Sequence, residues 1–273
     1  MSPEVGELDE AELARQLDAD PDAALAMLAD LTTATDEALR AHARRLAARL
    51  ILDRSRVGKP VSRGIGRRRL VPASRGGDLD LDASFDAVVT AAAEDRPAHL
   101  DDMLASDWGS PSLALCLLVD DSGSMTGARL AASAMVTAAC ALRAPAEHAV
   151  LAFARDVRPV RRLADVMPAE TVVERVLRLR GHGVTSLATA LRAAAETLGS
   201  SRASRRVVVL LSDCRATDDE DPVPAAAAIP ELLIIAPRDD TEEAAALADA
   251  SGARWATMDT VDAAVTVLND LLS

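Results

Sequence analysis

The chain has 273 residues, about half of them hydrophobic, so it can bury a sizeable core and disorder is not expected. Its net charge of −13 argues against general binding to nucleic acid or to anionic lipid, because both need an excess of lysine and arginine. No apolar run reaches the ~18 residues of a membrane span, and the acidic start Met1-Ser2-Pro3-Glu4 lacks the apolar stretch of a secretory signal, so we expect a cytoplasmic protein without membrane contact.

Residues 1–53 are predicted to form a helical N-terminal region. Asp20-Pro21 places a capping side chain before a proline at the first helical position. A second helix is expected to start at Thr35, and its apolar stripe consists of Leu39, Ala43, Leu46 and Leu50. These helices either form a small bundle of their own or pack on the main domain.

Residues 54–77 are predicted to be a basic linker rich in glycine and arginine. The segment holds eight basic residues and no acidic one, together with five glycines and two prolines. It is either a solvated tether that folds back on the acidic body or a docking segment for an acidic partner or nucleic acid. Residues 78–110 follow as a helical lead-in, with a helix that Asp82 caps and that runs to Glu94.

From residue 111 to 273 apolar strands alternate with helices. The expected strands are 113–119, 149–154, 157–160, 206–212, 231–236 and 254–258. The expected helices are 128–142, 168–179, 186–198, 241–250 and 261–272. Buried strands separated by helices predict an α/β fold with a doubly wound, mostly parallel, six-stranded sheet flanked by helices. Such a sheet places its functional site at the carboxyl ends of the strands.

Five oxygen-bearing side chains fall in segments expected at that edge. Asp120, Ser122 and Ser124 follow the first strand at alternate positions, Asp213 follows the strongest later strand, and Thr185 lies between them in a loop that contains glycine. Carboxylates and hydroxyls suit a hard cation, so Mg²⁺ or Mn²⁺ is the expected cofactor.

Other interpretations of these segments stay open. Aspartate and serine after a strand are common helix caps, and Thr185 could cap the helix that follows it, so the motif could be vestigial. Asp121 is expected to be a solvated carboxylate or a local cap, not a ligand. His182 is expected to be a surface or core residue and not a ligand. Cys116 and Cys140 are expected to be small buried hydrophobes, whereas the role of Cys214 stays open because it follows Asp213.

In order and spacing these segments resemble the metal-ion-dependent adhesion site (MIDAS) of von Willebrand factor A (VWA) domains. The resemblance implies a VWA domain over residues 111–273, with Ser122 and Ser124 binding the metal directly. It also implies that Thr185 and Asp213 bind directly or through water, and that Asp120 anchors the site. One metal position would remain for a carboxylate of a partner protein.

The sequence departs from the family pattern at two places. Cys214 stands where the family often has glycine after the second aspartate, and Gly183-Val184 precedes Thr185 where the family often has two glycines. Neither departure removes a metal ligand, but both put a larger side chain in place of glycine and could narrow the opening of the metal site.

The sequence lacks the motifs of several classes of enzyme that could use such residues. The sequence lacks the Asp-x-Asp of haloacid dehalogenase-type phosphotransferases, the Gly-x-Ser-x-Gly of serine hydrolases and a phosphate-binding P-loop. The only lysine, Lys59, lies too early in the chain for a response regulator. We therefore expect no enzymatic activity, with metal-assisted phosphoester hydrolysis as the alternative function.

Within the VWA family, the segment from Asp78 to Phe85 and the later Arg96-Pro97 are similar to the lead-in of CoxE-like proteins and magnesium-chelatase D subunits. These are intracellular bacterial members that work with AAA+ ATPases, of the MoxR type for CoxE-like proteins. The resemblance implies a cytoplasmic adaptor whose metal site binds an aspartate or glutamate of the ATPase or of its client.

Overall fold

The computed structural model describes every residue except 1–8, 35, 58–66, 76–77, 110–111, 123–126 and 182. The chain divides into two compact units. The larger unit combines residues 1–60 with residues 113–273, and the smaller unit is residues 61–112. Within the described part of the chain, no helix has both the length and the apolar character needed to cross a membrane.

The larger unit is built on a six-stranded sheet with the order β6-β5-β4-β7-β8-β9. All neighbouring strands are parallel except β6, which pairs antiparallel with β5. The strands are β4 (Leu113–Asp120), β5 (Glu147–Phe153), β6 (Val157–Arg161), β7 (Arg205–Leu211), β8 (Leu232–Pro237) and β9 (Arg254–Met258). This arrangement confirms the predicted six-stranded, mostly parallel sheet.

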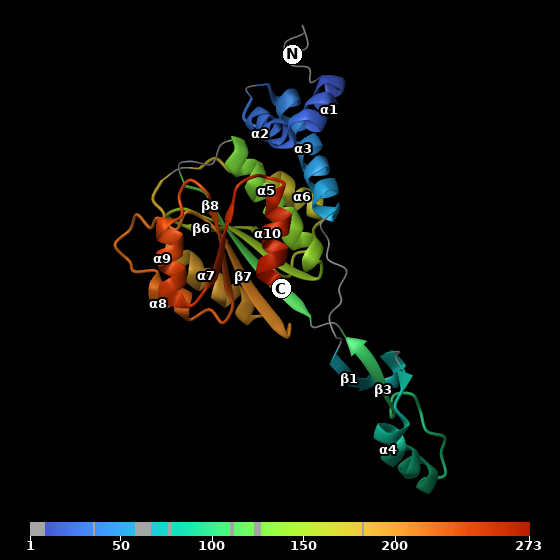
Figure 1. Cartoon of the computed structure of the whole chain (residues 1–273). Helices are drawn as coiled ribbons and strands as arrows, with labels where there is room; N and C mark the ends of the chain where they lie inside the picture. Colours follow the sequence, from blue (N-terminus) through green and yellow to red (C-terminus); the bar gives the residue numbers. More distant parts are fainter. Residues whose placement is uncertain are drawn as a thin grey trace. The chain divides into compact units, whose positions relative to one another are not determined.

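Helices cover both faces of this sheet, and Figure 1 shows α7, α8 and α9 on one side with α5 and α10 on the other. Alternate residues of β4 enter the two cores: Leu117 faces α5 and Leu118 faces α7. Burial on both faces explains why β4 is an unbroken apolar run. The helices are α5 (Gly127–Arg143), α6 (Ala169–Val176), α7 (Leu187–Gly199), α8 (Val223–Ala227), α9 (Glu242–Ser251) and α10 (Ala263–Leu272).

The N-terminal helices share the core of the sheet on the α5 side. They are α1 (Glu10–Ala19), α2 (Pro21–Leu31) and α3 (Glu37–Val57). Leu25, Leu28 and Ile51 are fully buried in the same cluster as Met135 of α5. Of the two arrangements open from the sequence, packing on the main domain is therefore the one observed. Helix α2 starts as predicted, because the Asp20 carboxylate accepts a hydrogen bond from Ala23 N at 3.1 Å; the predicted start at Thr35 lies outside the described residues.

The smaller unit holds a three-stranded antiparallel sheet with the order β1-β3-β2, and one helix. Its elements are β1 (Arg67–Pro72), the short 3-10 helix η1 (Ala73–Arg75), β2 (Asp78–Leu79), α4 (Leu81–Ala93) and β3 (Leu104–Gly109).

Three sequence predictions were wrong in the smaller unit. Residues 67–72 form a strand within the predicted linker, and residues 104–109 form a strand within the predicted helical lead-in, because each finds a partner more than thirty residues away in the other. The helix is present as expected, but its cap is Asp80, whose carboxylate accepts from Ala83 N at 3.0 Å, and not Asp82. The boundaries predicted at residues 53, 77 and 110 stay predictions.

Candidate metal centre

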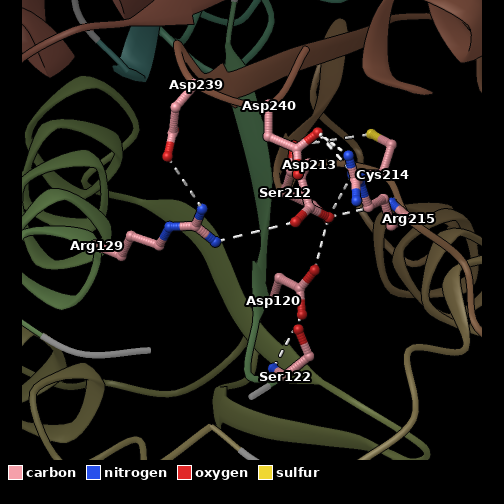
Figure 2. Close-up of polar contacts among 9 residues, drawn as sticks. All are labelled: Asp120, Ser122, Arg129, Ser212, Asp213, Cys214, Arg215, Asp239 and Asp240. Atoms are coloured by element: carbon pink, nitrogen blue, oxygen red, sulfur yellow. Dashed lines mark hydrogen bonds and ion pairs between the residues drawn. The ribbon is translucent and has the colours of Figure 1, made fainter. Parts of the chain in front are cut away.

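Asp120 ends β4 and is held by two hydrogen bonds. Its Oδ1 accepts from the backbone N of Ser122 at 3.0 Å, and its Oδ2 accepts from the hydroxyl of Ser212 at 2.6 Å (Figure 2). Ser212 follows β7, the strand beside β4. The carboxylate is therefore fixed between the carboxyl ends of two neighbouring strands.

The surroundings of Asp120 disfavour an unneutralised negative charge. Burial raises the pKa of its carboxyl group; the hydrogen bonds from Ser212 and Ser122 lower the pKa, and the charge of Asp213 raises it further. Two carboxylates that repel one another in a partly buried place would be neutralised by a cation.

Asp213 lies directly after Ser212, and its side chain is 19% exposed. Its Oδ1 accepts from Arg215 N at 3.1 Å. The guanidinium of Arg129, on the first turn of α5, lies between two carboxylates, 3.9 Å from Asp213 and 3.7 Å from Asp239 (Figure 2). Arg129 thus places a positive charge beside the predicted ligand Asp213.

Cys214 adopts a left-handed backbone conformation, with φ of 63°. Glycine adopts this conformation without strain, which is why a glycine suits the position in related domains. The backbone N of Cys214 donates to the Ser212 hydroxyl at 2.9 Å, so the turn helps to orient the group that holds Asp120. Burial strongly raises the pKa of the Cys214 thiol. The prediction of small buried side chains is confirmed for Cys116 and Cys140, and Cys214, whose role the sequence left open, is buried as well.

Thr185 is buried, and hydrogen bonds tie its loop to both neighbouring segments. Its N donates to the Thr217 hydroxyl at 2.7 Å, its carbonyl accepts from Thr217 N at 3.1 Å, and the next residue, Ser186, donates to Ala154 O at 2.8 Å. Thr217 follows Asp213, and Ala154 follows β5. The cap of α7 is Ser186, without a side-chain hydrogen bond, so Thr185 does not act as the cap that the alternative interpretation proposed.

Asp121 is a buried structural residue, and its predicted solvated role was wrong. Its side chain is only 1% exposed and forms an ion pair with Arg158 of β6. Its Oδ1 also accepts from Arg180 N at 3.1 Å, and its own N donates to Phe153 O at 2.7 Å. Asp121 thereby joins the loop after β4 to the loop before Thr185. The sequence carried no signal for this, because the partners are distant in the chain.

The N-terminal helices also reach the loop after β4. Asp30 at the end of α2 accepts a hydrogen bond from the N of Gly127, the first residue of α5, at 2.8 Å. Gly127 has a φ of +44°, and a Cβ there would lie 3.1 Å from the Asp30 carboxylate, so any other residue would be strained at this position. The guanidinium of Arg180 donates to Thr32 O at 2.7 Å. These contacts attach two loops to the end of α2: the loop that carries Ser122, and the loop that carries Thr185.

A cavity of about 600 Å³ opens beside Asp120, Ser122 and Asp213. Its other walls come from α2, α5 and the ends of β8 and β9. Besides the three predicted ligands it is lined by Asp22, Ala128, Arg129, Ala132, Ser133, Leu211, Ser212, Pro237, Arg238, Asp239, Met258, Asp259, Thr260 and Val261. The lining therefore mixes apolar side chains with charged ones, and most of the charged ones are acidic.

Of the five predicted ligands, the structure brings Asp120, Ser122 and Asp213 to one cavity. Thr185 lies in a loop that is hydrogen-bonded to Ala154, after β5, and to Thr217, in the loop that follows Asp213. Ser124 and His182 lie outside the described residues. Among the residues that are described, no three His, Cys, Asp or Glu side chains form a metal-binding group. Hydroxyls would have to complete the ligand set, as the motif predicts. Ser212 was missed, although its place before Asp213 at a strand end was a usable signal.

Comparison with known proteins agrees with this architecture. A family model described as "VWA domain containing CoxE-like protein" matches residues 43–269. The manganese-loaded TRAP protein of Plasmodium vivax is 17% identical with a TM-score of 0.50, over 60% of this chain and 74% of that one. A von Willebrand factor type A protein from Catenulispora acidiphila is 20% identical with a TM-score of 0.45, over 62% of this chain and 42% of that one. The PilB minor pilin of Streptococcus sanguinis is 13% identical with a TM-score of 0.49, over 60% of this chain and 61% of that one.

At 17% identity the TRAP structure shows a shared fold alone. This chain spans less than two thirds of the length of the other two proteins. No protein with a curated description matches the chain. VWA domains typically mediate protein–protein interaction and commonly bind a divalent metal at the MIDAS motif. Because the family model covers most of the sequence, the chain belongs to the family of CoxE-like proteins that contain a VWA domain.

Proposed function

We propose that this chain is a cytoplasmic adaptor that binds a partner protein through a divalent cation. Asp120, Ser122, Ser124, Thr185 and Asp213 would hold Mg²⁺ or Mn²⁺ and leave one position for an aspartate or glutamate of the partner. The partner would be an AAA+ ATPase of the MoxR type, or the client of that ATPase.

The observation that supports this proposal most is the placement of Asp120 and Asp213 at the ends of neighbouring strands, beside one cavity. The residues present fit a hard cation, because their donor atoms are all oxygens and because burial, together with the charge of Asp213, raises the pKa of Asp120. When bound, the cation would supply the positive charge that attracts a carboxylate from outside.

The chain's own residues prepare the site. Ser212 and the backbone N of Ser122 orient Asp120, so the carboxylate does not have to be ordered when a ligand arrives. Arg129 offers a second positive charge beside Asp213, which would assist an acidic partner. The apolar part of the cavity could take a side chain next to the partner's acidic residue.

Metal binding is tested by titrating the full chain with Mg²⁺ and Mn²⁺, using calorimetry and thermal unfolding. A metal at one hundred times its dissociation constant should stabilise the fold by about 2.7 kcal/mol. Asp120→Ala should abolish this gain. Asp239→Ala is the matched control, because this carboxylate lines the same cavity but is 78% exposed and outside the predicted ligand set. An equal metal effect in Asp120→Ala and wild type, or none in wild type, would refute the site.

Partner binding is tested with the purified MoxR-type ATPase of the same organism. We expect binding in Mg²⁺ that is lost on addition of EDTA and in Asp120→Ala, but kept in Asp239→Ala. Binding that ignores the chelator would rule out docking through the metal.

We propose further that the site does not turn over substrate. The full chain with Mg²⁺ or Mn²⁺ should therefore not hydrolyse p-nitrophenyl phosphate. Turnover that Asp120→Ala abolishes would instead support the alternative, a metal-assisted phosphoester hydrolase.

A further inference from the structure

Helix α4 of the smaller unit carries its large apolar side chains on the outside of that unit. The side of the helix that packs on the three-stranded sheet presents small residues, with Ser84 and Ala91 both buried. The large apolar residues, each between 40% and 69% exposed, are Leu81, Phe85, Val88 and Val89. We call these four residues the α4 stripe. An ordinary surface helix has the opposite arrangement.

The contacts of Ser84 explain why the small side is buried. Its hydroxyl accepts from Leu104 N at 2.9 Å and lies 3.1 Å from Leu104 O, so the helix backbone is held close to β3. A large side chain would not fit at this distance. The orientation of α4 on its own sheet is thereby fixed, and the stripe faces away from that sheet.

The four residues of the stripe form one continuous surface. They stand at positions i, i+4, i+7 and i+8, which share one face of a helix. Phe85 lies at the centre of the stripe and is one of only two phenylalanines in a chain with 1% aromatic residues. A chain that uses so few aromatic residues leaves this one 65% exposed, and aromatic side chains are enriched at the energetic centres of protein interfaces.

The charges around the stripe indicate what would cover it. The segment from Asp78 to Asp95 contains six acidic residues and no basic one. Two of them, Asp82 and Asp86, lie on the helix beside the stripe. A second copy of the chain would bring the same acidic helix and a net charge of −13, so self-association here would be opposed by like charges.

We propose that the α4 stripe docks into an apolar groove of another protein, and that arginine or lysine side chains line the edges of that groove. The apolar residues would supply the buried contact, as in other complexes where an amphipathic helix occupies a groove. Asp82 and Asp86 would pair with the basic edges and fix the direction of the helix. This surface is separate from the metal site, which lies in the other compact unit.

The proposal is tested by replacing Phe85 with photoreactive benzoylphenylalanine in the full chain, expressed in the organism's own cells. We expect a crosslink to one other protein, at a segment that contains both apolar and basic residues. The matched control is the same replacement at Leu100, which is apolar and 59% exposed in the same unit but lies outside the stripe, and which should crosslink far less. The crosslink at position 85 should persist in Asp120→Ala, so that failure of the metal site leaves this result intact.

The crosslinked protein is then purified and its affinity measured. Phe85→Ala and Asp86→Arg should each weaken binding at least tenfold, with unchanged circular dichroism and melting temperature because both positions are exposed. Affinity should also fall as salt concentration rises. The proposal is overturned by crosslinks to residues 1–60 or 113–273 of the same chain, by crosslinks to a second copy, by loss of the crosslink in Asp120→Ala, or by equal binding of the Phe85→Ala variant.

Discussion

The hydroxyl of Ser212 can be removed to test whether Asp120 is positioned by its neighbours. Ser212→Ala deletes the 2.6 Å bond to the Asp120 carboxylate and the 2.9 Å bond from the N of Cys214. A bond to a charged group contributes about 1.5–3 kcal/mol and a neutral one about 1 kcal/mol, so we expect the metal-free protein to lose roughly 2.5–4 kcal/mol of unfolding free energy. Loss of a residue that orients a ligand should weaken metal binding about 10–100-fold.

The assay is calorimetric titration with Mg²⁺ and Mn²⁺, together with urea unfolding of the metal-free protein. The loss of affinity should be larger at lower pH, because the Ser212 bond lowers the pKa of Asp120 and its removal lets protons compete better with the metal. Ser133→Ala is the matched control: Ser133 lines the same cavity, but its hydroxyl donates to Arg129 O within α5. If Ser212→Ala bound metal as tightly as Ser133→Ala at every pH, the positioning role would be refuted.

Three further changes probe the supports of the site and the core. Asp30→Ala removes the bond to Gly127 N and should cost about 1 kcal/mol in urea unfolding and weaken metal binding, while Asp30→Asn, which keeps an acceptor, should restore most of both. Asp121→Ala removes a buried acceptor of Arg180 N and should cost about 1–3 kcal/mol in the same assay; an unchanged midpoint would contradict its bracing role. His148 is buried, and burial followed by the charge of Arg161 lowers its pKa to about 4. In the unfolded chain the pKa of histidine is about 6.5, so below pH 6.5 the unfolded state takes up a proton that folded His148 does not. The free energy of unfolding should therefore fall by about 3 kcal/mol between pH 6.5 and pH 4. His148→Gln should reduce this fall.

Much of the larger unit could be predicted because its signals are local. The apolar run of β4 reflects burial on two faces, and Asp20-Pro21 starts α2 through a cap that needs only neighbouring residues. Asp120 and Asp213 could be placed together because parallel neighbouring strands end at the same edge of the sheet.

The features that sequence reasoning missed depend on residues far apart in the chain. The run of arginines at the start of β1 resembles a linker until β3 provides its hydrogen-bond partners. The sequence predicts that Asp121 is solvated, but in the structure Arg158 and the loop of Arg180 bury its side chain. The exposure of the apolar face of α4 could not be predicted either. The sequence pattern shows which face of a helix is apolar, but not whether another part of the chain buries that face.

The shared core of the N-terminal helices has a consequence for how the protein is made. Leu25 and Leu28 of α2 are buried against α5, which the ribosome synthesises only after the whole of residues 61–112. The apolar faces of helices α2 and α3 therefore stay exposed until the sheet has been synthesised. During this time the helices can bind chaperones or aggregate. A shortened chain that began at residue 113 would have the opposite defect, since the face of α5 around Met135 would have nothing to cover it.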